Sequence, residues 1–341
     1  MHIIFQAQIH FNMLNINIKS HKISLIKETI ITLFLIFLCI IFAINKNYSK
    51  TVLQGLLIWL SLVVPSLFPY FFVVAFISKL KLTSKIANGI SPFSKRVFNL
   101  SGTAFFCYIV GAFSGYPLGS KLVGEFKEKC ILGETESERA SMISSNASPM
   151  FLIGSVGSVM FNSIKFGALL FLTHIISSLI SALIFSRYKY KSKPTNNVAP
   201  FIKCDAIFYE SVYSSVISML VVGGIIALFY LLTNILFDIG ALNILIKPLT
   251  LILGNSESAK GVTFALFEYT CGLKILATSI PLKQALPIVS FICAFSGFSI
   301  IMQSVAYLKK AKIKTTPFLF SKLVVAIINF FVGLTISVIF F

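Results

Sequence analysis

"AFSGYPLGSK" occupies residues 112–121, and "AFSGF" follows at residues 294–298, each within a strongly apolar part of the chain. Glycine and proline weaken or interrupt a helix, and a charged lysine is poorly suited to hydrocarbon. Irregular backbone at membrane depth is tolerated only where it is buried in protein or lines a water-filled cavity. The two stretches therefore predict interrupted helices around a polar interior.

The composition predicts a polytopic α-helical membrane protein. Of the 341 residues, 57% are hydrophobic and only 12% are charged, and the mean hydropathy is +0.91. Several apolar segments approach the roughly 20 residues that cross a bilayer as a helix. These segments are residues 29–44, 52–77, 97–113, 140–161, 166–185, 211–237, 244–280, 285–307 and 317–341.

The net charge of +18 reports orientation in the membrane and does not indicate nucleic-acid binding. Lysine and arginine gather in short loops at 78–96, 186–193 and 309–314, and such loops lie on the cytoplasmic side. The six cysteines include no CxxC pair, so we expect no disulfide framework, metal site or cofactor.

The basic loops constrain the topology. An even number of crossings must separate cytoplasmic loops, yet three apolar segments lie between the first two and three between the last two. One segment of each set must enter and leave by the same face. We assign these re-entrant hairpins to residues 91–121 and 247–283, which places the N-terminus in the cytoplasm and the C-terminus outside.

The expected fold is all-α, an inverted repeat of two halves preceded by one helix. Each half contains three transmembrane helices and one re-entrant hairpin. The expected regions are a disordered cytoplasmic leader at 1–24, a leading transmembrane helix at 25–50, a first half at 51–190, a cytoplasmic linker at 191–208 and a second half at 209–341.

The two hairpins share a motif. "YPLGSK" at 116–121 and "YTCGLK" at 269–274 both read Y-x-x-G-x-K. "SSNASPMFLIG" at 144–154 then corresponds in order to "ICAFSGFSIIMQ" at 292–303. Transporters with inverted repeats commonly bind their solute near the membrane midplane, where discontinuous helices meet.

The ends of broken helices expose N–H groups that suit an anionic solute. Hydroxyl, amide and charged side chains at the breaks are therefore the candidate substrate-binding residues. They are Ser114, Tyr116, Gly119, Lys121, Ser145, Asn146, Ser148, Glu268, Thr270, Lys274, Ser296, Ser299 and Gln303.

Structural roles compete with binding for some polar residues. Lys121 and Lys274 are equally well suited to anchoring at the membrane surfaces. His174, alone in an apolar segment, is expected to form a hydrogen bond between helices. We favour a site role for Glu268, because burying a carboxylate in an apolar segment costs free energy unless the group is paired or functional. The charged segment 125–139 is expected to be a solvated structural connector.

The motifs "SGYPLGSKL", "SSNASPMFLIGSVG", "FEYTCGLK", "AFSGFSIIMQ" and "PFLFSKLV" resemble the sporulation integral membrane proteins of the YlbJ type, relatives of nucleoside-recognition (Gate) domain proteins. The resemblance covers roughly residues 52–341. It implies a carrier in endospore formation that delivers dipicolinate, a small planar dianion. It leaves open whether Glu268 is then protonated, pairs with a lysine or handles a coupling proton.

The expected function is therefore transport of a small anionic solute across the bacterial cell membrane or the forespore membrane. Two alternatives remain open: a membrane scaffold for spore or envelope assembly, and a nucleoside transporter. The sequence contains neither a convincing nucleophile–base pair nor a metal-ligand motif, so we do not expect an enzyme. The expected partners are the solute and the lipid bilayer, and the sequence leaves homo-oligomerisation open.

Overall fold

The structure, a computed structural model, describes residues 28–29, 31–33, 35–37, 39–43, 45, 47–189 and 206–341, apart from the side chain of Lys81. The expected leader at 1–24 and most of the linker at 191–208 lie outside these residues. The described residues between 28 and 43 are helical. The chain divides into two compact units, Met1–Thr51 and Val52–Phe341.

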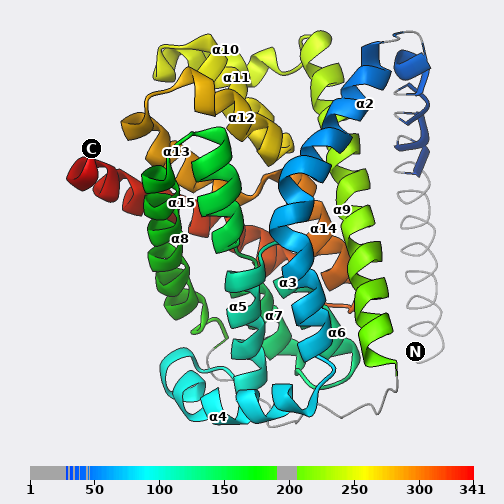
Figure 1. Cartoon of the computed structure of the whole chain (residues 1–341), viewed down its shortest axis with the longest axis vertical. Coiled ribbons are helices and arrows are strands. Elements are labelled where there is room, and N and C mark those ends of the chain that lie inside the picture. Colours follow the sequence, from blue (N-terminus) through cyan, green and yellow to red (C-terminus); the bar gives the residue numbers. More distant parts are fainter. Residues whose placement is uncertain are drawn as a thin grey trace, which may run out of the picture. The chain divides into compact units, whose positions relative to one another are not determined.

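Within the described residues every regular element is a helix, as expected (Figure 1). The elements before residue 190 are α2 (Asn47–Ile58), η1 (Trp59–Val63, a π-helical segment), α3 (Val64–Ile77), α4 (Lys81–Phe98), α5 (Gly102–Ser114), α6 (Leu118–Glu128), α7 (Glu134–Ile143), η2 (Met150–Met160, also π-helical) and α8 (Ile164–Phe185).

The elements after residue 205 are also helices. They are α9 (Ile207–Asp238), α10 (Asn243–Leu253), α11 (Ser256–Phe267), α12 (Tyr269–Ser279), α13 (Leu282–Phe295), α14 (Gly297–Lys310) and α15 (Thr315–Phe340).

Five helical stretches in the described residues are long and apolar enough to cross a membrane. The pair Leu82–Phe98 and Gly102–Ser114, bent by 90°, makes a sixth if it counts as one span. The prediction of a polytopic helical membrane protein is confirmed. The five stretches are Asn47–Ile77, Ile164–Phe185, Ile207–Asp238, Leu282–Lys310 and Thr315–Phe340.

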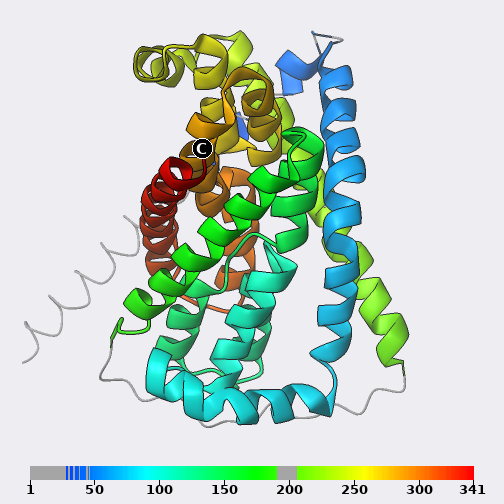
Figure 2. The same ribbon diagram turned by 60° about the vertical axis from the view of Figure 1, so that its left-hand side comes forward.

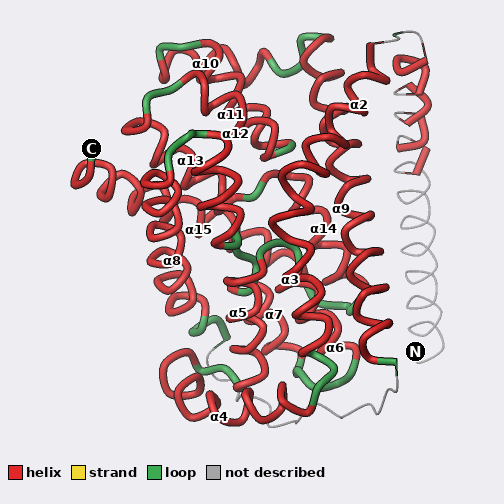
Figure 3. Tube along the Cα trace, in the orientation of Figure 1, coloured by secondary structure: helices red, strands yellow, loops and turns green. Residues whose placement is uncertain are grey.

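Short non-helical segments interrupt the bundle in its interior as well as at its ends (Figure 3). Residues 115–117 separate α5 from α6, and residues 144–149 separate α7 from η2. Glu268 separates α11 from α12, and Ser296 separates α13 from α14. All four expected interruptions are therefore present.

Positive φ angles explain two of these interruptions. Gly115 has φ +81°, while Ser296 and Gly297 have φ +72° and +69°. L-residues other than glycine pay a steric penalty there, so each position ends the helix before it. A Cβ added at Gly297 would lie only 2.8 Å from the Ala265 carbonyl oxygen.

The helices α4 and α10 lie at opposite ends of the bundle (Figures 1 and 2). The hairpin α5–α6 starts from the α4 end, and the hairpin α11–α12 starts from the α10 end (Figure 1). The prediction of a basic loop over 78–96 was wrong, because α4 fills most of it. Lysines separate its apolar residues, so α4 contains no continuous apolar segment and is recognisable only by its amphipathic pattern.

The charged connector at 125–139 is not solvated throughout, contrary to expectation. Glu136, Glu138 and Arg139 belong to α7 and are fully buried. Glu136 accepts a hydrogen bond from the Ser101 backbone N–H at 2.6 Å, and Glu138 forms a 2.6 Å ion pair with Lys189. A backbone donor and an ion pair thus bind these carboxylates where the sequence suggested water, and the Glu138 Oε1 has no hydrogen-bond partner among the described residues.

Candidate functional site

A small cavity, called the central cavity below, lies where the interrupted helices meet. Its free volume is about 30 Å³, enough for roughly one or two water molecules. It is lined by Val63, Leu67, Tyr116, Ser148, Phe151, Val222, Ile226, Glu268, Tyr269, Thr270, Ile300 and Gln303. Both interrupted regions therefore contribute polar groups to one space, and five predicted site residues line it: Tyr116, Ser148, Glu268, Thr270 and Gln303.

The first hairpin contributes Tyr116 at the turn between α5 and α6. Its hydroxyl donates a 2.7 Å hydrogen bond to the backbone carbonyl of Cys293 in α13. Ser148 faces this turn, because a Cβ at Gly115 would lie 3.0 Å from the Ser148 Cβ. The Ser148 Oγ accepts a hydrogen bond from the Phe151 N–H at 3.2 Å, which ties Ser148 to the first turn of η2.

The second hairpin contributes Glu268, which caps the N-terminus of α12. Its carboxylate accepts hydrogen bonds from the backbone N–H groups of Thr270, at 3.3 Å, and Cys271, at 2.7 Å. The side chain is only 1% exposed. We expected this helix end to offer its N–H groups to an anionic solute, but the protein's own carboxylate occupies them.

Gln303 of α14 provides the least satisfied polar group of the cavity wall. It is 3% exposed, and within the described part of the chain neither Oε1 nor Nε2 has a hydrogen-bond partner. A buried carboxamide without partners costs free energy, on the order of 1–3 kcal/mol for each group. The position of Gln303 in the cavity lining marks it as a ready donor and acceptor for a bound molecule.

Ser296 and Ser299 flank the break between α13 and α14 but do not line the central cavity. The Ser296 Oγ donates to the carbonyl of Phe295 at 2.5 Å, which is a local contact of the bend. Ser299 is fully buried, and its Oγ lacks a partner among the described residues.

Asn146 does not line the central cavity and belongs to a polar network. Its Nδ2 donates to the Ile143 carbonyl at 2.8 Å, and its Oδ1 accepts from the Ser178 hydroxyl at 3.0 Å. Ser178 also lies 3.1 Å from the Tyr108 hydroxyl. These contacts fix the loop between α7 and η2 to α8, so the geometry gives Asn146 a positioning role.

Lys322 of α15 is a charged residue that was missed as a site candidate. It is 2% exposed, its Nζ donates to the Ser145 carbonyl at 3.1 Å, and it lies 4.4 Å from the centroid of the Tyr116 ring. No carboxylate in the described part of the chain lies within ion-pair distance of it. A lysine inside an apolar 25-residue segment is itself a signal of function.

His174 belongs to the same polar region. Its Nε2 accepts a 3.0 Å hydrogen bond from the Ala147 N–H, so the ring fastens α8 to the loop between α7 and η2. Lys322 and Asn329 of α15 lie near the imidazole. The expected hydrogen-bonding role is present, although the acceptor faces a loop backbone instead of a second helix.

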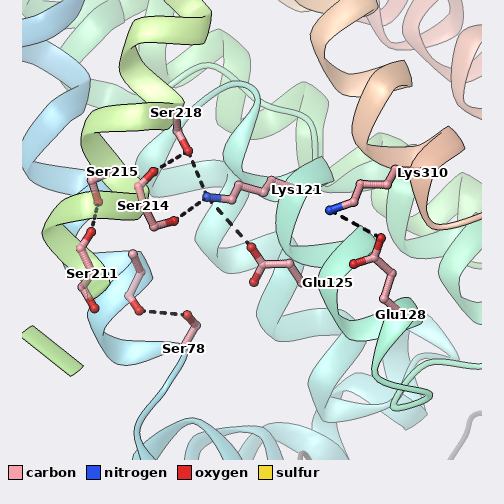
Figure 4. Close-up of polar contacts among 10 residues, drawn as sticks. Ser78, Lys121, Glu125, Glu128, Ser211, Ser214, Ser215, Ser218 and Lys310 are labelled. Carbon is pink, nitrogen blue, oxygen red and sulfur yellow. Dashed lines mark hydrogen bonds and ion pairs between the residues drawn. The ribbon is translucent and has the colours of Figure 1, made fainter. Parts of the chain in front are cut away.

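The two lysines of the shared motif lie elsewhere. Lys121 is half-buried, and its Nζ donates to the hydroxyls of Ser214 at 3.1 Å and Ser218 at 3.0 Å in α9, with Glu125 at 3.9 Å (Figure 4). Lys274 is exposed. Neither lines the central cavity, and the positive charge near it comes from Lys322.

The remaining candidates support the backbone. A Cβ at Gly119 would lie 1.9 Å from the Ser144 carbonyl oxygen, so only glycine allows this approach. Ser114 donates a hydrogen bond to the Val110 carbonyl at the end of α5. Ser145 holds Lys322 through its carbonyl, while its Oγ has no partner among the described residues.

Comparison with known proteins adds one match. No protein-family model and no solved structure matches the chain. Over 301 residues, the chain is 28% identical to the sporulation integral membrane protein YlbJ of Bacillus subtilis (strain 168). The aligned region covers 81% of this chain and 73% of that protein. The match agrees with the resemblance drawn from the motifs: the chain is similar to a sporulation integral membrane protein of the YlbJ type.

Proposed function

We propose that this protein is a transporter that carries a small solute through the central cavity. The observation that carries the proposal is the unsatisfied, buried carboxamide of Gln303 in a space that both interrupted regions line. Discontinuous helices that meet at one polar site are the recurring design of secondary transporters. The cavity of about 30 Å³ corresponds to a closed state that must widen to admit a solute.

The order of elements supports an inverted repeat. Each proposed half has a long helix, a helix across one end of the bundle, a hairpin, an interrupted helix and a second long helix. The two hairpins start from opposite ends of the bundle (Figure 1). Rocking of one half against the other would open the central cavity to each side in turn. We keep the proposed orientation, with the α4 end cytoplasmic because of its basic residues.

A small anion remains the proposed solute, and dipicolinate is the first to test. Lys322 supports this choice, because a buried ammonium group without a carboxylate partner is costly unless an anion joins it. Tyr116 connects the two features, since it lines the central cavity and lies against Lys322. Glu268 is held by the N-terminus of α12, which moderates its repulsion of an anion.

The test is uptake by liposomes that contain the purified full chain. Labelled dipicolinate, nucleosides and simple dicarboxylates are compared, with empty liposomes as the blank. Gln303→Ala should lower uptake of the transported solute about tenfold, the effect of one or two lost hydrogen bonds. Gln284→Ala is the matched control, because Gln284 is exposed on α13. Uptake equal to the blank for every solute would remove the proposal.

The same assay separates the alternatives. Preferential uptake of nucleosides would assign a nucleoside transporter. A scaffold predicts that exposed residues of the charged segment 125–139 matter most, namely Glu128, Lys129 and Glu134. If changing these three to glutamine blocks sporulation while uptake stays normal, the scaffold is favoured.

A further inference from the structure

The amphipathic helix α4 is not explained by transport. It meets α5 at 90° and runs across one end of the bundle (Figure 2). One face is locked in place: Thr83 donates to the Ile77 carbonyl at 2.5 Å, and Ser94 donates to the Leu100 carbonyl at 3.0 Å. A Cβ at Gly102 would lie 1.7 Å from the Ala87 carbonyl oxygen, so α4 packs directly on the start of α5.

A second face of α4 is apolar and exposed. Leu82, Ile86, Phe93 and Val97 are all exposed, Phe93 by 55%. Their spacing of 4, 7 and 4 residues places them along one stripe of a helix with 3.6 residues per turn. The Phe93 ring makes edge contacts with Phe98 and Phe105, each at a ring-centroid distance of 6.0 Å. The rest of the Phe93 side chain is exposed. The stripe lies beside the packed face.

A third face of α4 is basic. Lys85, Lys95 and Arg96 are exposed, and residues 78–99 contain no aspartate or glutamate. On a helical wheel, Lys85 and Arg96 fall directly beside the apolar stripe on the side away from the packed face. An apolar stripe with cations along its border is the pattern of a helix that lies in the membrane interface.

The helix α10 at the opposite end provides an internal comparison. Ile244, Leu251 and Ile252 are exposed there, Leu251 by 87%. The segment Asn243–Leu253 carries Lys247 as its single charge. Both end helices thus present apolar side chains, but only α4 has a cluster of cations. The difference indicates a partner at the α4 end that is both apolar and negatively charged.

We infer that α4 lies in the interfacial layer of the membrane and binds anionic phospholipids, with its apolar stripe among the acyl chains, Lys85 and Arg96 at the headgroups, and Lys95 on the side of the helix away from the acyl chains. The cations and the 90° bend argue against α4 as part of a span. Charge complementarity favours a lipid surface, which supplies apolar chains and phosphate groups at the same depth. This inference does not depend on the transported solute.

Lipid-specific fluorescence quenching tests the inference. Trp59 is the only tryptophan, so Trp59→Phe with Phe93→Trp leaves one reporter on the apolar stripe. The full chain is placed in nanodiscs of phosphatidylcholine and phosphatidylglycerol in which one or the other lipid has brominated acyl chains. We expect quenching in both cases, and stronger quenching by brominated phosphatidylglycerol at equal mole fraction.

The charge requirement is tested in the same reporter chain. Lys85→Gln, Lys95→Gln and Arg96→Gln together should abolish the preference for phosphatidylglycerol, since each cation near an anionic surface contributes about fivefold in binding. The matched control changes Lys129, Lys309 and Lys312, which are exposed near the same end outside α4, to glutamine. It removes equal charge and should leave the preference intact.

Three outcomes would overturn the inference. Absence of quenching by either brominated lipid would mean that the stripe is outside the bilayer and faces a protein or water. Equal quenching by the two lipids in the parent reporter would exclude selective binding of anionic lipid. Equal loss of preference in the control variant would assign the effect to net charge instead of α4.

Discussion

The hairpins α5–α6 and α11–α12 share Y-x-x-G-x-K, yet only two of the three fixed positions of the motif have the same role in both. Tyr116 and Tyr269 both line the central cavity. Gly119 and Gly272 both allow close backbone approach, since a Cβ at Gly272 would lie 2.2 Å from the Ala265 nitrogen. The lysines diverge: Lys121 binds serines of α9, whereas Lys274 is exposed.

The charges around the cavity come from outside the shared positions. On the first side, Lys322 of α15 lies against the ring of Tyr116. On the second side, Glu268 precedes the motif and caps α12. The motif therefore specifies how each hairpin packs, while residues outside it make the surroundings of the two hairpins chemically different: Glu268 directly before the second motif, and Lys322 in α15 beside the first.

The largest expected effect tests the shared packing. Gly119→Ala and Gly272→Ala should each destabilise the protein by about 3 kcal/mol, because the new methyl group meets backbone atoms that cannot withdraw. Thermal unfolding of the purified protein in detergent measures this. Gly224→Ala is the control, since no atom lies within 4 Å of its added Cβ, and it should be neutral or slightly stabilising. Equal melting temperatures for all three variants would contradict the common packing role.

The next effect tests which lysine serves the site. Lys322→Met should lower dipicolinate uptake about 30-fold, equal to about 2 kcal/mol, because the cation next to Tyr116 is lost. Its thermal stability should be unchanged or higher, since a buried charge is replaced by an apolar chain of similar size. Lys274→Met should leave uptake unchanged. If Lys274→Met lowered uptake and Lys322→Met did not, the lysine of the shared motif would be the one that binds the solute.

A smaller effect tests the role of Glu268 at the N-terminus of α12. Glu268→Ala and Asn255→Ala each remove a side chain that caps a helix, and each should cost about 1 kcal/mol of unfolding free energy. Only Glu268 lines the central cavity, so uptake should fall in Glu268→Ala alone. If both variants transport normally at equal protein amounts, Glu268 is a cap without a role in the site.

The smallest effect concerns the ion pair between Lys189 and Glu138 of α7. The hydrogen bond from Lys189 to Glu138 raises the pKa of Lys189 above its ordinary value. Its stabilising contribution is therefore complete below that ordinary value, about 10.4, and is lost as the pH rises beyond it. Lys189 is largely solvent-exposed, so the contribution is small. Melting temperature against alkaline pH should fall less steeply in Lys189→Gln than in the parent.

Much of the fold could be predicted because hydrocarbon imposes simple rules. Apolar length located the long helices, and glycine, proline and serine located the interruptions. The helix α4 was missed, because its apolar residues are separated by lysines and its period is visible only as an amphipathic pattern. Burial of Glu136 and Arg139 was missed because their partners, such as the Asn99 carbonyl for Arg139, are backbone groups far along the chain.

The site could be predicted only in part, for a similar reason. Gln303 and Glu268 stand out as polar residues within apolar segments, and both line the cavity. Asn146 stands out equally, but its hydrogen bonds are used in packing. Lys322 lies near the cavity because it contacts Tyr116, which is more than 200 positions earlier in the chain. Neither residue spacing nor composition predicts a contact over that distance.

Two bonds near the cavity have a consequence for biosynthesis. The hydroxyl of Tyr116 and the carbonyl of Ser145 find their partners in Cys293 and Lys322, each 177 residues further along the chain. Until Cys293 and Lys322 have been synthesised, these polar groups therefore need temporary partners in the membrane, such as water or the insertion machinery. The polar centre of the protein is completed only when α15 enters the membrane.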